Sequence, residues 1–100
     1  MTDRSGPTIV KEMGYSLDEF ARVLPSAMRD WRVGGEPGRW EVSIDGIPAV
    51  SISLVPQPPR RMGMLSIPVS AVSIRFQPHA TDVVAEFMTR FDRGFHRGGG

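Results

Sequence analysis

The sequence predicts an α+β fold in which two helices pack on one face of an antiparallel sheet. Between Trp40 and Phe76, apolar residues alternate with serine or charged residues, a period of two that is typical of strands with one buried face. On either side of this region, apolar residues recur at spacings of three and four, as in amphipathic helices. The predicted order of elements is β-α-β-β-β-β-α.

The chain is expected to begin with a flexible N-terminus over residues 1–7, because this polar segment contains Gly6 and Pro7. The first predicted strand covers residues 9–15. A helix then begins after Ser16, where Ser16 and Glu19 have the spacing of a capping box. Pro25 lacks an amide donor and crowds the preceding turn, so a kink or break is expected near Leu24.

The central strands are predicted from alternation and from their turn residues. Residues 32–39 contain three glycines and a proline and are predicted to form a loop. Strands over 40–44 and 50–54 should form a hairpin through Asp45-Gly46, which suits a type I′ turn. Residues 56–61 (PQPPRR) contain three prolines and are predicted to be an exposed hairpin tip. Two further strands are expected over 62–67 and 71–76, with a turn or bulge at 68–70.

The second helix is predicted to start at Thr81 as N-cap and to end near Gly94. Its apolar stripe consists of Val84, Phe87, Met88, Phe91 and Phe95. We therefore expect a single α+β domain over residues 8–97, followed by a glycine tail at 98–100. This element order resembles one half of the TATA-binding-protein fold. The resemblance implies an architecture only, because fold likeness does not carry function.

Composition and motifs argue against an enzyme. The 100 residues include no cysteine, which excludes thiolate chemistry and cysteine-ligated metals, and neither a nucleophile elbow nor a phosphate-binding glycine motif occurs. His79, Asp82 and Glu86 could form a metal or general-base site. A loop histidine beside two acids that favour a helix N-terminus explains the same residues. We expect no catalytic residue, no metal and no cofactor.

The same features set expectations for location and charge. No apolar run has the length of a signal peptide or a membrane span, so we expect a cytoplasmic protein with no membrane partner. The formal charge of +1 provides no global field toward nucleic acid.

The function indicated is that of a small non-catalytic binding or assembly module, acting on a protein partner or as a homodimer. The face of the sheet away from the helices should carry small hydroxyls and charges, which allow close approach of a flat partner. The expected members of this face are Glu41, Ser43, Ser51, Ser53, Ser66, Ser73 and Arg75. The expected partner contacts are Arg60, Arg61 and Arg75.

Other readings of the sequence remain open. A nucleic-acid-binding module would use Arg60, Arg61 and the Arg-Gly segment over residues 93–100. A carrier or modifier protein would use Gly100 as an activated terminus, because the tail resembles those of ubiquitin-like modifiers and sulfur carriers. Residues 56–61 also match the P-x-x-P-x-R spacing of ligands for SH3-type grooves.

Overall fold

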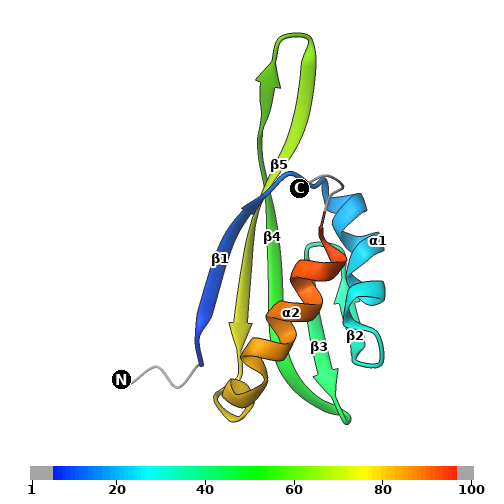
Figure 1. The fold of residues 1–100 in the computed structure, drawn as a ribbon, viewed down its shortest axis with the longest axis vertical. Coiled ribbons are helices and arrows are strands. Elements are labelled where there is room, and N and C mark those ends of the chain that lie inside the picture. Colours follow the sequence, from blue (N-terminus) through cyan, green and yellow to red (C-terminus); the bar gives the residue numbers. More distant parts are fainter. Residues whose placement is uncertain (1–5, 97–100) are drawn as a thin grey trace.

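The computed structural model describes residues 6–96 and contains a five-stranded antiparallel sheet with two helices against one face (Figure 1). The strand order is β1-β5-β4-β3-β2. The predicted α+β class and element order are confirmed, although several boundaries differ. The elements are β1 (Thr8–Met13), α1 (Leu17–Met28), β2 (Arg32–Glu36), β3 (Arg39–Ile44), β4 (Ile47–Met62), β5 (Leu65–Phe76), a 3₁₀ turn (Pro78–Val83) and α2 (Val84–Gly94).

Helix α1 begins at the predicted capping box. The Ser16 hydroxyl accepts a hydrogen bond from the Glu19 amide, at 3.2 Å, and the Glu19 carboxylate accepts one from the Ser16 amide, at 2.9 Å. The expected break near Leu24 does not occur, and the helix continues through Pro25 to Met28. Pro25 lies in the last turn, where Leu24, Ala27 and Met28 are buried, so packing holds the turn together.

Strand β2 replaces the loop predicted over residues 32–39. Its five residues pair with β3, from Arg32 opposite Ser43 to Glu36 opposite Arg39. Gly35 has φ of +102°, and a Cβ there would overlap the backbone of Arg39. Glycine at this position therefore permits a close strand pairing, whereas composition alone indicated a loop.

The turn between β3 and β4 is the predicted one. Asp45 and Gly46 both have positive φ, at 54° and 79°, as a type I′ turn requires.

Strands β4 and β5 form one long hairpin, which corrects two predictions. Residues 56–61 are not its tip: β4 runs through them to Met62, and the turn lies at Gly63 and Met64. A bulge between Gln57 and Arg60 accommodates the adjacent prolines. Residues 68–70, predicted as a turn or bulge, form no turn, because β5 continues from Leu65 to Phe76. The irregularity at this level is the bulge on β4, between the pairs Gln57–Val69 and Arg60–Ile67.

The start of α2 also differs from the prediction. A 3₁₀ turn over Pro78–Val83 precedes the helix, which has Val83 as N-cap, so Thr81 does not cap it. The predicted apolar stripe is correct in its centre, with Phe87 and Phe91 buried.

The core lies between the two helices and the covered face of the sheet. Eight strand residues of alternating parity point into it: Trp40, Val42, Val50, Ile52, Leu54, Val72, Ile74 and Phe76. Aromatic rings dominate the helix side, where Phe20 stacks on Phe95 with centroids 4.5 Å apart. Among residues 6–96, no helix is long and apolar enough to cross a bilayer.

Candidate functional site

The face of the sheet opposite the helices, here the open face, is defined by strand register, because directly opposed residues of paired strands point to the same side. One transverse row contains Thr8, Arg75, Ser51 and Glu41, and the next contains Val10, Ser73, Ser53 and Arg39. The expected open face is therefore present. Ser66 departs from it, because it lies opposite Arg61 on the helix side of the hairpin.

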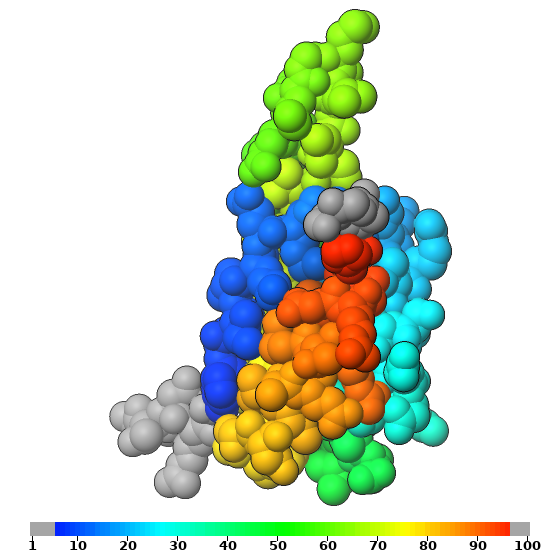
Figure 2. Space-filling view, in the orientation of Figure 1, coloured from blue at the N-terminus to red at the C-terminus, as the bar shows by residue number. Residues whose placement is uncertain are grey.

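The β4–β5 hairpin projects beyond the rest of the molecule as an arm, which we define as residues 57–69. The pairing of β1 ends at Ser70 and that of β3 at Ser53, so in the arm β4 and β5 have only each other as neighbours. The arm is the narrow projection in Figure 2 and extends along the longest dimension of the molecule, 46 Å (Figures 1 and 2). An isolated two-stranded hairpin is marginally stable in water, so the arm lacks the support that the body strands have.

Large apolar side chains are exposed on the arm and near its root. The exposed fractions are 57% for Val55, 58% for Met62 and 68% for Leu65, and Met64 in the turn is fully exposed. Exposed apolar patches of this kind typically mark interaction sites.

The three predicted contact residues do not form one cluster. Arg60 lies opposite Ile67 on the open-face side of the arm and forms an ion pair with Glu12, at 3.0 Å, which spans β5. Arg61 points to the other side of the arm. Arg75 lies on the open face of the body, next to Ser51 and Thr8.

A shallow hollow occupies the open face of the body, and of the three predicted contact residues only Arg75 lines it. Its volume is about 820 Å³. Within residues 6–96, neither Arg39 nor Arg75 at its border forms an ion pair. The lining residues are Thr8, Gly35, Arg39, Trp40, Glu41, Ser51, Ile52, Ser53, Ser73, Arg75 and Gln77.

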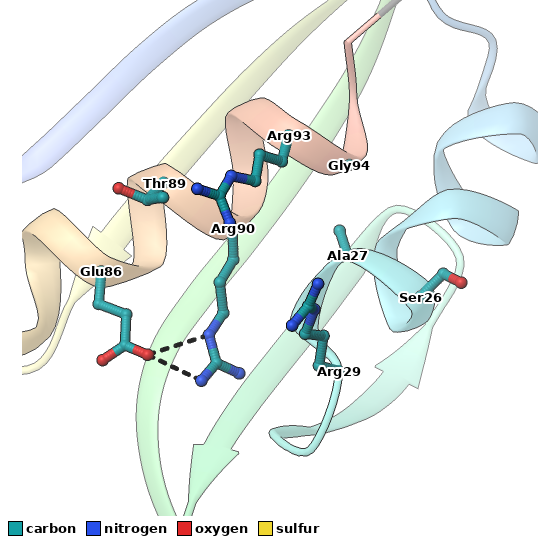
Figure 3. Close-up of a pocket in the computed structure, with 8 residues that line it drawn as sticks. All are labelled: Ser26, Ala27, Arg29, Glu86, Thr89, Arg90, Arg93 and Gly94. Carbon is teal, nitrogen blue, oxygen red and sulfur yellow. Dashed lines mark hydrogen bonds and ion pairs between the residues drawn. The ribbon is translucent and has the colours of Figure 1, made fainter.

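A second hollow, of about 340 Å³, lies between the C-terminal end of α1 and one face of α2 (Figure 3). Arg90 dominates it, with hydrogen bonds to the Met28 carbonyl, to Asp30 and to Glu86, and with its guanidinium 3.7 Å from the Trp31 ring centroid. Burial alone would lower the pKa of Arg90, but its hydrogen bonds to Asp30 and Glu86 outweigh burial and raise it. The Arg90 hydrogen bond lowers the pKa of Asp30. These contacts join the helices and leave Arg90 little capacity for a ligand.

The structure does not bring His79, Asp82 and Glu86 together as a metal or general-base site. His79 places Nε2 3.0 Å from the Pro48 carbonyl, and Glu86 binds Arg90. Across the described part of the chain, no three His, Asp or Glu residues are grouped in a way that could hold a metal ion.

Sequence reasoning missed the apolar part of the open face, which includes Val10, Val55 and Leu65. The alternation over 65–75 contained the signal, because Leu65, Ile67, Val69 and Ala71 share the parity of Ser73 and Arg75. Reading residues 68–70 as a turn hid this continuity.

Residues 97–100, which are half of the C-terminal segment of the nucleic-acid alternative and include Gly100 of the carrier alternative, lie outside the described residues. Comparison with protein-family models, curated proteins and solved structures finds no match to this chain. The likeness to half of the TATA-binding-protein fold therefore stays at the level of element order.

Proposed function

We propose that this protein is a non-catalytic binding and assembly module whose docking surface consists of the open face and the arm. The observation that carries the proposal is the arm itself, a two-stranded projection with Met62, Met64 and Leu65 exposed. A partner that covers these side chains would remove apolar surface from water and support a hairpin that has no further strand paired beside it.

The open face of the body provides a flat surface for the same partner. Its serines are short, so a second surface can approach the sheet closely, and Arg75 and Glu41 provide polar contacts at its centre. Apolar anchors with a polar surround are the usual organisation of a protein interface.

A nucleic-acid partner is less well supported by the same residues. Binding to phosphates depends on the number of cations that face the strand. Arg60 is neutralised by Glu12, and Arg61 points to the opposite side of the arm. The tip beyond them is apolar, which fits a protein partner better.

Site-specific photocrosslinking in the cells that naturally contain this protein tests the proposal. A photoreactive amino acid replaces Met64 in one variant and Ser26, on the exposed side of α1, in the control. We expect a discrete crosslinked product from position 64 and none from position 26. Absence of a product from position 64 would overturn the proposal.

The mass of that product separates the partners. Twice the chain mass of 11.0 kDa indicates a second copy, and another defined mass indicates a different protein. A nuclease-sensitive product would indicate nucleic acid and would replace the present proposal.

A further inference from the structure

The exposed apolar residues gather on one side of the sheet. Six large apolar side chains are exposed among the described residues, and four of them, Val10, Val55, Met62 and Leu65, point to the open face by register. Val10 lies opposite Ser73, Val55 opposite Ala71, and Met62 opposite Leu65. Together with the half-buried Ile67 and Val69, they form a stripe that runs from the body to the tip of the arm.

The two ends of the stripe lie at equal distances from one level of the sheet. Along β5, the Met62–Leu65 pair marks one end and Ser73, beside Val10, marks the other. Val69, opposite Gln57, lies midway between positions 65 and 73. Consider two sheets stacked open face to open face, with a twofold axis that lies between them and runs across the strands at this level. The axis brings the apolar tip of each copy over the row of the other copy that contains Val10 and Ser73.

The hollow in the body lies at the level that the partner copy's arm tip would reach under this symmetry. Its rows contain Ser73 and Arg75, which are four and six residues from Val69 on one side, and the tip lies four to six residues away on the other. The short side chains of Ser51, Ser53 and Ser73 leave room for Met62 and Leu65 of a partner copy. A convex apolar tip and a shallow hollow are thus present on the same face at matching distances.

The charges of this face also agree with a twofold arrangement. Arg60 lies at the level of Ile67, two residues from the axis, and Glu12 lies at the level of Ala71, two residues on the other side. Stacking therefore places each Arg60 at the level of the other copy's Glu12, which is the acid it already binds in its own chain. Opposite charges therefore share one level of the stacked face, with β5 between them, as they do within each chain.

The prolines of the arm favour contact with a partner through its open face over pairing with another strand at its edges. Pro56 at its root and Pro58, Pro59 and Pro68 within it each lack an amide donor, which weakens pairing of a further strand along either side of the hairpin.

We propose that the partner of this surface is a second copy of the chain, stacked open face to open face about a twofold axis at the Gln57–Val69 level, with each arm tip in the other copy's hollow. This inference rests on the proposed function and specifies its partner. Closed twofold pairs are the commonest form of self-association, and stacked sheets pack about 10 Å apart.

Distance measurements between spin labels test this geometry, since the absence of cysteine permits single labelling sites. Variants Gln57→Cys, Met64→Cys and Arg75→Cys each receive one label, and light scattering first establishes the oligomeric state. With a rise of about 3.3 Å per residue, we expect about 10–20 Å between symmetry-related labels at position 57, about 35 Å at 64 and about 40 Å at 75. Mixed samples labelled at 64 and 75 should give a short distance, below about 20 Å.

Two results would overturn the inference. A dimer formed through the outer edge of β1 would give a shorter distance at position 75 than at 57, the reverse of the order expected here. A chain that stays monomeric at all concentrations would exclude a second copy as the partner. If position 64 then still crosslinks to another protein, the proposed function survives without this inference.

A pair of charge variants supplies a matched control. Leu65→Lys places a charge inside the stacked face and should raise the dimer dissociation constant on the order of tenfold or more. Arg61→Glu changes a charge on the other side of the arm and should leave the dissociation constant within about threefold. Equal effects of the two variants would contradict the assignment of the open face. Both positions are exposed and remote from the core, so each variant should fold, and circular dichroism is the check.

Discussion

Arg90 connects three separate parts of the chain through one side chain. It donates to the last turn of α1 at the Met28 carbonyl, at 2.7 Å, and to Asp30 in the following connection, at 2.8 Å. It also contacts Trp31 through its guanidinium face. Its side chain is 18% exposed, so these contacts are partly shielded from water and salt. Lysine could not reproduce the planar, multiple contact.

The lowered pKa of Asp30 leads to a prediction about acid stability. A carboxyl group whose folded pKa is depressed stabilises the fold above its ordinary pKa of 3.8, and this contribution is lost as the pH falls through the lowered folded value. Asp30→Asn removes the contribution. We therefore expect the stability difference between wild type and Asp30→Asn to be largest near neutral pH and to shrink below about pH 4.

Urea denaturation followed by circular dichroism between pH 2 and pH 7 measures this difference. Asp82→Asn is a matched control, because Asp82 forms no ion pair within residues 6–96. Parallel pH profiles for wild type and Asp30→Asn would show that Asp30 does not contribute in this way.

The crossing of the two helices depends on a pair of small residues. A Cβ at Gly94 would overlap the methyl group of Ala27 and come within 2.9 Å of its Cα. Gly94 therefore allows the helices to approach closely, which extends the sequence-based view of this residue as a helix terminator.

Gly94→Ala should destabilise the protein, although alanine ordinarily improves a helix. The propensity gain is about 1 kcal/mol, and the displacement of Ala27 in a packed crossing costs about 1–3 kcal/mol, so we expect a net loss of up to about 2 kcal/mol. Thermal denaturation measures the loss. The double variant Ala27→Gly with Gly94→Ala should recover part of it, and a stabilised single variant would contradict the close crossing.

The sequence correctly predicted the features that depend only on residues close together in the chain. The capping box at Ser16 and the Asp45-Gly46 turn are governed by contacts within four residues, and both are confirmed. The alternation that began at Trp40 also identified the buried face over residues 40–42, 50–54 and 72–76. It failed over residues 65–67, where Leu65 and Ile67 point to the open face.

Elements that depend on distant pairing were predicted less well. Pro56, Pro58 and Pro59 disfavour a central strand. They lie in the arm or at its root, where β4 pairs with β5 alone and a missing donor is tolerated. Gly34 and Gly35 likewise indicated a loop, and their pairing with Glu41 and Trp40 makes them a strand. The candidate surface was therefore predicted in most of its serines and in Arg60 and Arg75, but wrongly for Ser66 and Arg61. Its apolar part was missed, because that part requires the length of β5.

At the scale of the whole molecule, an aromatic cluster joins both helices to the sheet. Phe87 is fully buried, with its ring centroid 5.2 Å from that of Phe76 and 5.9 Å from that of Phe91. Trp31 stacks beside it at 6.5 Å. The two-stranded arm adds no comparable interior, so the body must supply the stability of the fold.

Phe87→Ala should lower the free energy of unfolding by about 3–5 kcal/mol, because it removes a ring from a filled core. Phe87→Leu keeps most of the volume and should cost less than about 1.5 kcal/mol. Urea titration followed by tryptophan fluorescence reports both values through Trp31. A loss below 1 kcal/mol for the alanine variant would contradict this packing.

The four prolines at positions 56, 58, 59 and 68 have a consequence for solutions of high concentration. Fibrous growth of β-proteins proceeds when an uncovered strand templates the next one through its free amides. A projecting ribbon with so many amides missing is a poor template. The chain can thus expose a long apolar hairpin to solvent without nucleating fibrils.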